Sequence, residues 1–248
     1  MAEPANVCLS LSNRPENVPL VREMLTGVAE TVDLDPNDLN DIRTAVAEAC
    51  NNVVLHAYEG AEGPLQVELR VSSSAIEVVV RDHGTGIKPR IRAAEEDALG
   101  IGLSIIQALA RTVEFKDVTG GGTEVRMEFL TSSPSALEAP GEDGLEAPAI
   151  ERPELAATTG VAIAPTCLAR TVLPRVLSVL AARAGFSTDR ISDVQLVADA
   201  LVARAPDSTG GVGSGSLSVA VSVAPRNLEM RIGPLDSEML ALRLVDRA

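Results

Sequence analysis

The amino-acid sequence predicts an α+β protein in two parts, a two-layer α/β sandwich followed by a smaller, degenerate copy of similar topology. Helical and strand periodicities alternate along residues 5–130, a Pro-, Ala- and Glu-rich segment interrupts them at 131–158, and the helical opening of the first part then returns. We therefore expect an N-terminal domain at 1–130, an acidic linker at 131–158 and a C-terminal domain at 159–248.

Hydrophobic periodicity predicts the elements of the N-terminal domain. Asp35-Pro36 indicates an N-cap followed by proline at the first helical position, so a helix should begin there. The expected elements are a strand at 6–12, helices at 15–32 and 35–57, a hairpin at 64–72 and 75–82, a helix at 99–111, and strands at 112–116 and 123–130. This order predicts a layer of helices on a mixed sheet.

The C-terminal domain resembles the start of the N-terminal one. Residues 34–42 align without gaps with 186–194, and a second hairpin is expected at 216–223 and 228–232. We favour an internal duplication over a chance similarity between two amphipathic helix pairs.

Composition excludes several functions. The net charge is −14 without a cluster of Lys and Arg, and aromatic residues make up only 2%, which argues against direct nucleic-acid binding. No segment approaches the ~20 apolar residues of a membrane span, and the N-terminus lacks the pattern of a secretory signal, so we expect a cytoplasmic protein. Cys8, Cys50 and Cys167 lack metal-ligand spacing and are interpreted as buried, reduced thiols.

The predicted second helix carries a carboxylate and a carboxamide. Glu48 and Asn52 are four residues apart, so they share one helical face. Such a pair can position a water or hydroxyl and can ligate a hard cation such as Mg²⁺. Taken alone, the pair would more simply be a solvated polar stripe.

The strand ending at Asp82 runs into Gly84 and Gly86. A carboxylate at a strand end can accept a hydrogen bond from an exocyclic amine such as that of adenine, and nearby glycines allow close approach of a flat ligand. The alternative is an ordinary turn, because Asp-x-Gly is common in turns.

Two further glycine-rich elements follow. Gly100 and Gly102 open the predicted third helix, where free N–H groups would suit phosphates, although a flexible loop end would look the same. Residues 120–123 (Gly-Gly-Gly-Thr) precede the last strand and could be only a hairpin turn.

In this fixed order, the four elements resemble the Bergerat-type (GHKL) ATPase superfamily, which includes Hsp90, DNA gyrase, MutL and histidine kinases. The closest resemblance is to bacterial anti-sigma factor serine kinases. These proteins carry sequences similar to Glu48-Ala49-x-x-Asn52-x-x-x-His56-x-Tyr58 and Arg81-Asp82-x-Gly84-x-Gly86-Ile87. The resemblance covers residues 5–130 and implies the histidine-kinase-like ATPase fold with ATP and Mg²⁺ as ligands.

The resemblance also implies residue roles. Glu48 would be the general base toward a serine hydroxyl, Asn52 the magnesium ligand, and Asp82 the acceptor for the adenine amino group. The other positions that the resemblance places around ATP are Gly84, Gly86, Ile87, Gly100, Ile101, Gly102, Leu103 and Thr123, the last by supporting Asp82. His56, one turn below Asn52, is interpreted as a packing or supporting residue.

The implied partners are a sigma factor and a STAS-type anti-anti-sigma factor. Arg22 matches a position at which the family contacts both, although an ordinary exposed arginine is an equal alternative. A homodimer is left open. The leading hypothesis is thus an anti-sigma serine/threonine kinase, and the alternative is a non-catalytic ATP-binding module that regulates a partner by occupancy. The ATPase module of a sensor histidine kinase is disfavoured, since no phosphoacceptor hairpin precedes the domain.

Two departures from the family pattern weaken the catalytic part of the hypothesis. The lid between Gly86 and Gly100 is short, and an acidic residue, Asp97, stands near the place of the usual basic residue. Arg90 and Arg92 are the candidates for contacting the γ-phosphate. Phosphoryl transfer depends mainly on positioning and charge stabilisation, so nucleotide binding is the firmer expectation.

The predicted C-terminal copy has lost these chemical groups. In the ungapped alignment Ala200 and Arg204 take the places of Glu48 and Asn52, and no second glycine box follows. Such a copy would serve as a built-in dimer partner or as a docking surface.

Overall fold

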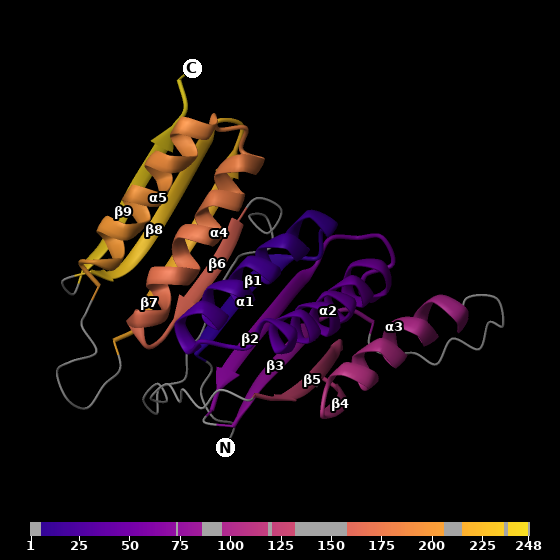
Figure 1. The fold of residues 1–248 in the computed structure, drawn as a ribbon. Coiled ribbons are helices and arrows are strands. Elements are labelled where there is room, and N and C mark those ends of the chain that lie inside the picture. The colour runs from indigo at the N-terminus through magenta and orange to yellow at the C-terminus, as the bar shows by residue number, and fades with distance from the viewer. Residues whose placement is uncertain are drawn as a thin grey trace.

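The computed structural model describes residues 6–72, 74–85, 96–118, 121–131, 158–205, 215–235 and 238–247. Within these residues, nine strands form one continuous sheet in the order β4-β5-β3-β2-β1-β6-β7-β8-β9 (Figure 1). The strands are β1 (Val7–Ser12), β2 (Pro64–Val71), β3 (Ala75–Asp82), β4 (Thr112–Asp117), β5 (Thr123–Leu130), β6 (Thr158–Ile163), β7 (Leu217–Ala224), β8 (Asn227–Leu235) and β9 (Glu238–Val245).

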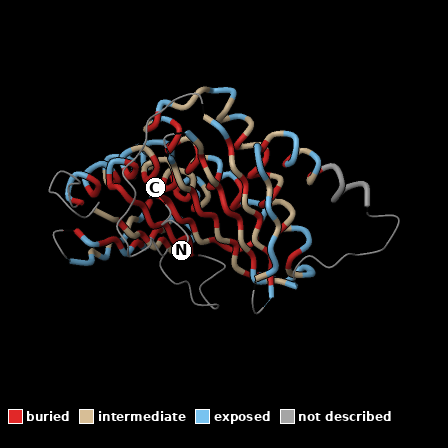
Figure 2. The backbone as a smooth tube through the Cα atoms, turned by 90° about the horizontal axis from the view of Figure 1, so that it is seen from below, coloured by how far each residue is buried: buried red, intermediate tan, exposed pale blue. Residues whose placement is uncertain are grey.

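The helices lie along one face of this sheet (Figure 1). They are α1 (Val18–Val32), α2 (Pro36–Asn52), α3 (Glu96–Leu109), α4 (Ala169–Arg183) and α5 (Thr188–Val202), with 3-10 turns η1 (Pro15–Asn17) and η3 (Thr166–Leu168) and the π-helical turn η2 (Val53–Ala57). Buried residues, drawn red in Figure 2, line the interior between the sheet and the helices. The fold is therefore the predicted two-layer α+β arrangement.

Local signals place the helix boundaries. The side chain of Asp35 accepts a hydrogen bond from the Asn37 N–H at 2.8 Å, which satisfies one of the free donors at the start of α2. Asp33, with a φ of 53°, adopts the left-handed conformation that ends α1. The N-cap expected from Asp35-Pro36 is confirmed.

The sheet differs from its prediction in two ways. Every described strand pairing is antiparallel, so the expectation of a mixed sheet was wrong. The pair α1–α2 returns the chain antiparallel to β1, and β5 inserts between β3 and β4. Strands β6 and β9 were not predicted. Strand β6 is buried at all six positions, so its sequence shows no alternation of polar and apolar residues. The predicted linker lies outside the described residues except for its two end residues.

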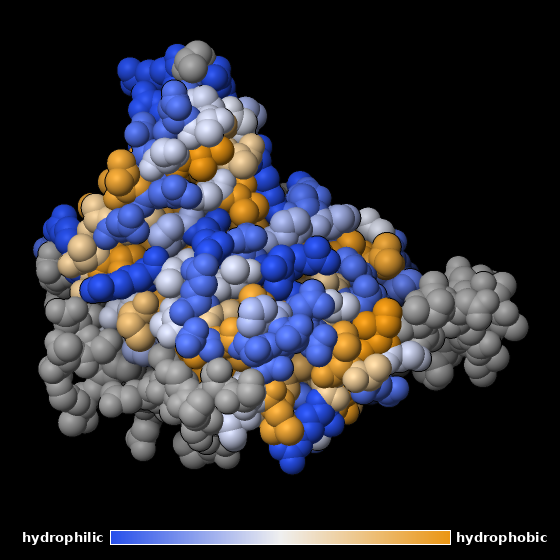
Figure 3. Space-filling view, in the orientation of Figure 1, coloured by the Kyte–Doolittle hydropathy of each residue, from blue (hydrophilic) through white to orange (hydrophobic). Residues whose placement is uncertain are grey.

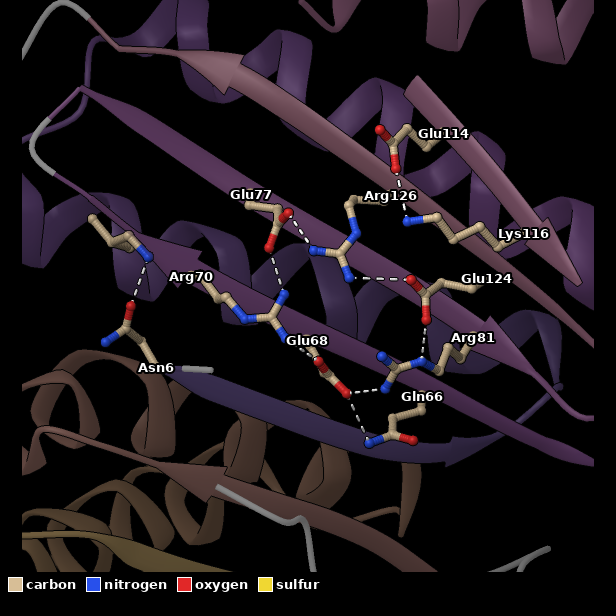
Figure 4. Close-up of polar contacts among 11 residues, drawn as sticks. Asn6, Gln66, Glu68, Arg70, Glu77, Arg81, Glu114, Lys116, Glu124 and Arg126 are labelled. Atoms are coloured by element: carbon tan, nitrogen blue, oxygen red, sulfur yellow. Dashed lines mark hydrogen bonds and ion pairs between the residues drawn. The ribbon is translucent and has the colours of Figure 1, made fainter. Parts of the chain in front are cut away.

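The face of the sheet opposite α2 and α3 carries a closed ring of alternating charges on β2, β3 and β5 (Figure 4). The ring surrounds Val79, which is fully buried although it lies on this face between Glu77 and Arg81. The ion pairs are Glu68–Arg70 at 2.7 Å, Arg70–Glu77 at 2.5 Å, Glu77–Arg126 at 2.6 Å, Arg126–Glu124 at 3.1 Å, Glu124–Arg81 at 2.7 Å, and Arg81–Glu68. Each charge therefore has two partners of opposite sign.

Glu68→Gln is expected to lower the free energy of unfolding by about 1–3 kcal/mol, because it leaves two half-buried guanidinium groups with a weaker acceptor. The matched control is Glu114→Gln, which breaks a solvent-exposed pair with Lys116 and should change stability much less, because water screens such pairs. Urea denaturation of both variants measures the difference. Equal losses in the two variants would show that the ring contributes no more than a surface pair.

Candidate functional site

Two helices bring the first group of predicted site residues together. Glu48 and Asn52 lie one turn apart on α2, both half-buried, and α2 packs against α3. A Cβ atom on Gly102 of α3 would lie 3.3 Å from Oε2 of Glu48 and 3.7 Å from Oδ1 of Asn52. Glycine at position 102 therefore leaves the two side-chain oxygens uncovered, where any larger residue would fill the space in front of them.

The second group is centred on Asp82, at the end of β3. Asp82 as a residue is 4% exposed, and its carboxylate accepts a hydrogen bond from the Gly84 N–H at 2.8 Å. The backbone and hydroxyl of Thr123 also hydrogen-bond to it. Burial raises the pKa of Asp82, and the bonds from Gly84 and Thr123 partly offset this shift. The result is a carboxylate held in a fixed orientation with little water around it.

Close backbone approaches require glycine on both sides of Asp82. Gly122 has a φ of +103°, and a Cβ there would lie 2.1 Å from the carbonyl oxygen of Asp82. A Cβ on Gly84 would lie 2.0 Å from the carbonyl oxygen of Ala57, to which Thr85 donates a hydrogen bond at 2.9 Å. The predicted glycines thus join the β3 loop to the end of η2 and to the start of β5.

Tyr58 is a positioning residue to which sequence reasoning gave no role. Its hydroxyl accepts a hydrogen bond from the His83 N–H at 2.8 Å and donates one to the Pro64 carbonyl at 2.5 Å. Gly63 leaves room for its ring, because a Cβ there would lie 2.0 Å from Cε1 of Tyr58. The available signal was that Tyr58 is the single tyrosine of the chain and part of the quoted motif.

Tyr58→Phe is expected to weaken ATP binding by roughly two- to tenfold, because it removes an acceptor worth about 0.5–1.5 kcal/mol from the loop that carries Asp82. Calorimetric titration with Mg-ATP measures the change. Tyr58→Leu, which also removes the ring, serves as the comparison for lost packing. An unchanged dissociation constant in Tyr58→Phe would mean that the loop does not need this bond.

The other predicted residues have mixed outcomes. Gly100 and Gly102 lie in the second turn of α3, which begins at Glu96, so the expectation that they open the helix was wrong. Residues 96–98 extend the helix because they are not helix breakers. Leu103 is half-buried and packs against the core, and Arg22 is exposed on α1. Gly86, Ile87, Arg90, Arg92 and Gly120 lie outside the described residues, and the side chain of Ile101 is not described.

His56 is exposed on η2, which contradicts the packing alternative, and its supporting role stays a prediction. One expectation about the cysteines was wrong. Cys167 is exposed at η3, whereas Cys8 and Cys50 are buried as expected. Burial raises the pKa of the Cys50 thiol to about 12, which keeps it neutral within α2.

None of the helices in the described part of the chain combines the length and hydropathy required to cross a bilayer.

Residues 11–129 match the family described as histidine kinase-like ATPase domain. The chain is 31% identical over 137 residues to the serine-protein kinase RsbW of Bacillus pumilus, covering 49% of this chain and 84% of the relative. It is 34% identical over 121 residues to the RsbW of Listeria innocua, covering 44% and 77%. It is 29% identical over 127 residues to the anti-sigma F factor of Thermoanaerobacter sp. strain X514, covering 48% and 89%.

The chain therefore belongs to the histidine-kinase-like ATPase family, close to the anti-sigma factor kinases. The family match ends at residue 129 and takes in all the residues of the two groups described above. Membership in this family implies nucleotide binding.

Proposed function

We propose that this chain is an anti-sigma factor and serine-protein kinase that binds Mg-ATP, sequesters a sigma factor and phosphorylates a serine of a STAS-domain anti-anti-sigma factor. The observation that carries the proposal is the convergence of Glu48, Asn52 and Gly102 from two helices. The names of the relatives support the choice of partners. Both partners belong to bacterial transcription control, so the proposal includes a cytoplasmic location.

The residues fit a bound nucleotide with its magnesium. Asn52 offers an oxygen ligand to the cation, and the space left by Gly102 lies directly in front of it. Asp82 is held by Gly84 and Thr123 in a way that suits acceptance of a hydrogen bond from the adenine amino group. Magnesium, when bound, would neutralise negative charge on the phosphate oxygens. The loop residues Gly86 and Ile87 and the α3 residues Gly100, Ile101 and Leu103 complete the proposed nucleotide contacts.

The proposed reaction places Glu48 as a general base. Its carboxylate accepts the proton of the attacking serine hydroxyl while the serine oxygen forms the new bond to the γ-phosphorus. The bond between the γ-phosphorus and its bridging oxygen breaks, and ADP leaves. Within the described residues, Glu48 takes part in no ion pair, so its charge is not already neutralised by a described cation. Arg22, exposed on α1, is proposed to contact the protein partners.

The test has two stages with the full chain. Calorimetry with ATP and Mg²⁺ should first give saturable heat. Incubation with γ-labelled ATP and a STAS-domain protein of the same host should then transfer label to a serine. ATP binding without any transfer would favour the alternative function, a regulatory module that acts by nucleotide occupancy; the acidic residues 95–97 ahead of Gly100 favour that alternative. The absence of heat with ATP and Mg²⁺ would exclude both the kinase and the nucleotide-dependent regulatory module.

A further inference from the structure

The two halves of the chain repeat one order of elements. The N-terminal half runs β1-η1-α1-α2-η2-β2-β3, and the C-terminal half runs β6-η3-α4-α5-β7-β8, with no counterpart of η2 among its described elements. Strand β9 pairs with β8 as β5 pairs with β3, but it follows β8 after a two-residue connection, without a counterpart of α3 and β4. Each half also has a residue in the left-handed conformation after its first helix. Asp33 ends α1, and Gly185, its counterpart in the alignment, follows α4.

The alignment that pairs Leu34 with Phe186 also superimposes the two cores. Nine positions that are buried in α1 and α2 have large or small apolar counterparts that are also buried in α4 and α5, whereas buried Val18, Gly27, Ala45 and Ala47 have exposed or half-buried counterparts. The matched buried pairs are Leu20 and Val172, Val21 and Leu173, Met24 and Val176, Leu25 and Leu177, Val28 and Leu180, Ile42 and Val194, Val46 and Ala198, Ala49 and Leu201, and Cys50 and Val202.

The halves meet about an approximate two-fold axis, as two identical subunits would. Leu9 of β1 is the direct antiparallel partner of Val161 of β6, its counterpart in the same alignment. Across the helix layer, Glu23 of α1 forms an ion pair at 3.1 Å with Arg175 of α4, which is again its counterpart. The two contacts place one axis through the centre of the sheet and through the α1–α4 pair, which lie side by side in Figure 1.

The contact is complementary only between unlike halves. If the halves were identical, Glu23 would face a second glutamate, whereas here Arg175 bonds to both Glu23 and Glu30. A Cβ on Gly27 would lie 2.8 Å from the carbonyl oxygen of Thr171, so α1 can approach α4 this closely only with glycine at position 27. The counterpart of Gly27 is Val179, so the two helices do not contribute the same residue at this close approach.

We propose that the C-terminal half is a covalently attached substitute for a second copy of the N-terminal half. It occupies the β1 edge and the outer surface of α1, the surfaces through which a copy would add, and it carries Ala200 and Arg204 where the site residues Glu48 and Asn52 would be. The chain is then a monomer that holds a complete two-half sheet and a single nucleotide site. The count of one site rests on the proposed function, whereas the monomeric assembly does not.

An engineered disulfide tests the assembly. The hydroxyl oxygens of Thr31 on α1 and Thr171 on α4 are 2.7 Å apart, so cysteines at both positions are close enough to bridge. The variant Thr31→Cys/Thr171→Cys also carries Cys167→Ser, which removes the exposed native thiol. The matched control combines Thr31→Cys with Ser192→Cys on α5, which lies beyond α4 from α1 (Figure 1).

On oxidation with oxidised glutathione at low micromolar concentration, the first variant should form an intramolecular disulfide and run as a compact monomer on a non-reducing gel. The control should not. Sedimentation of the unmodified chain should give the mass of one chain, 25.8 kDa, at every concentration. A disulfide-linked dimer of the first variant, no disulfide in it, or a dimeric mass in sedimentation would each overturn the proposal.

Titration with ATP supplies a separate result. One nucleotide per chain is expected, and two per chain would overturn the assignment of a site-less second half. The intramolecular disulfide could form in a chain that binds no nucleotide. That result would support the proposal that the C-terminal half takes the place of a second copy, and it would contradict the proposed nucleotide function.

Discussion

Glu48→Gln is expected to slow phosphoryl transfer to the STAS-domain substrate by about 10²–10⁴-fold, the usual contribution of a general base. Glutamine keeps the size of the side chain beside Gly102 but cannot accept the serine proton. The dissociation constant for Mg-ATP should change little, because the carboxylate acts on the hydroxyl and Asn52 is the proposed cation ligand. Single-turnover assays with γ-labelled ATP measure the rate, and calorimetry measures the binding.

The matched control is Glu16→Gln, which makes the same chemical change at an exposed residue of η1. It should leave the transfer rate unaltered. Normal transfer by Glu48→Gln would show that another group, or none, accepts the proton. A large loss of ATP affinity in Glu48→Gln would instead point to a direct role of Glu48 in holding the cation.

Asp82→Ala is expected to weaken ATP binding by roughly ten- to a hundredfold, because a hydrogen bond to a charged group contributes about 1.5–3 kcal/mol. The Asp82 carboxylate is buried and fixed by hydrogen bonds from Gly84 and Thr123. Asp82→Asn is the size-matched control, since it keeps one oxygen acceptor but removes the charge. Its affinity for ATP should lie between those of the unmodified chain and Asp82→Ala. Equal affinities in all three proteins would remove Asp82 from the adenine contact.

The raised pKa of Asp82 gives this residue a pH signature with a defined sign. Between the unfolded value near 3.8 and the higher folded value, the folded chain binds more protons than the unfolded chain. The contribution of Asp82 to stability is therefore present at low pH and is lost as the pH rises through the folded pKa. Over the same interval ATP affinity should increase as the carboxylate ionises. Asp82→Asn should show neither change, which denaturation and calorimetry across acidic pH can measure.

Sequence patterns predicted the local structure well because the causes are local. The Asp35 cap and the spacing of Glu48 and Asn52 depend on neighbours along the chain. The all-antiparallel sheet and the strand β6 depend on partners far away in the sequence, and a fully buried strand shows no alternation. The contact of Gly102 with Glu48 and Asn52 is also long-range, and it is what turns separate motifs into one site.

The surface combines hydrophobic and hydrophilic regions. Hydrophobic patches lie among hydrophilic residues over α4–α5 and over α2–α3 in Figure 3. Leu196 on α5 is an exposed large hydrophobic residue. In the alignment of the two halves, the counterpart of Leu196 is Thr44 of α2. Because α5 has no counterpart of α3 packed against it among the described elements, its outer side remains open where α2 is covered.

The pairing of β1 with β6 has a practical consequence for handling the protein. Two separate sheets would expose four edge strands, whereas the joined sheet exposes two, β4 and β9. An uncovered β1 would present the sequence VCLSLS, an apolar, uncharged strand with free backbone donors and acceptors, which is a template for aggregation. Truncated proteins that end within residues 132–157 should therefore be difficult to keep in solution even when the nucleotide site is intact.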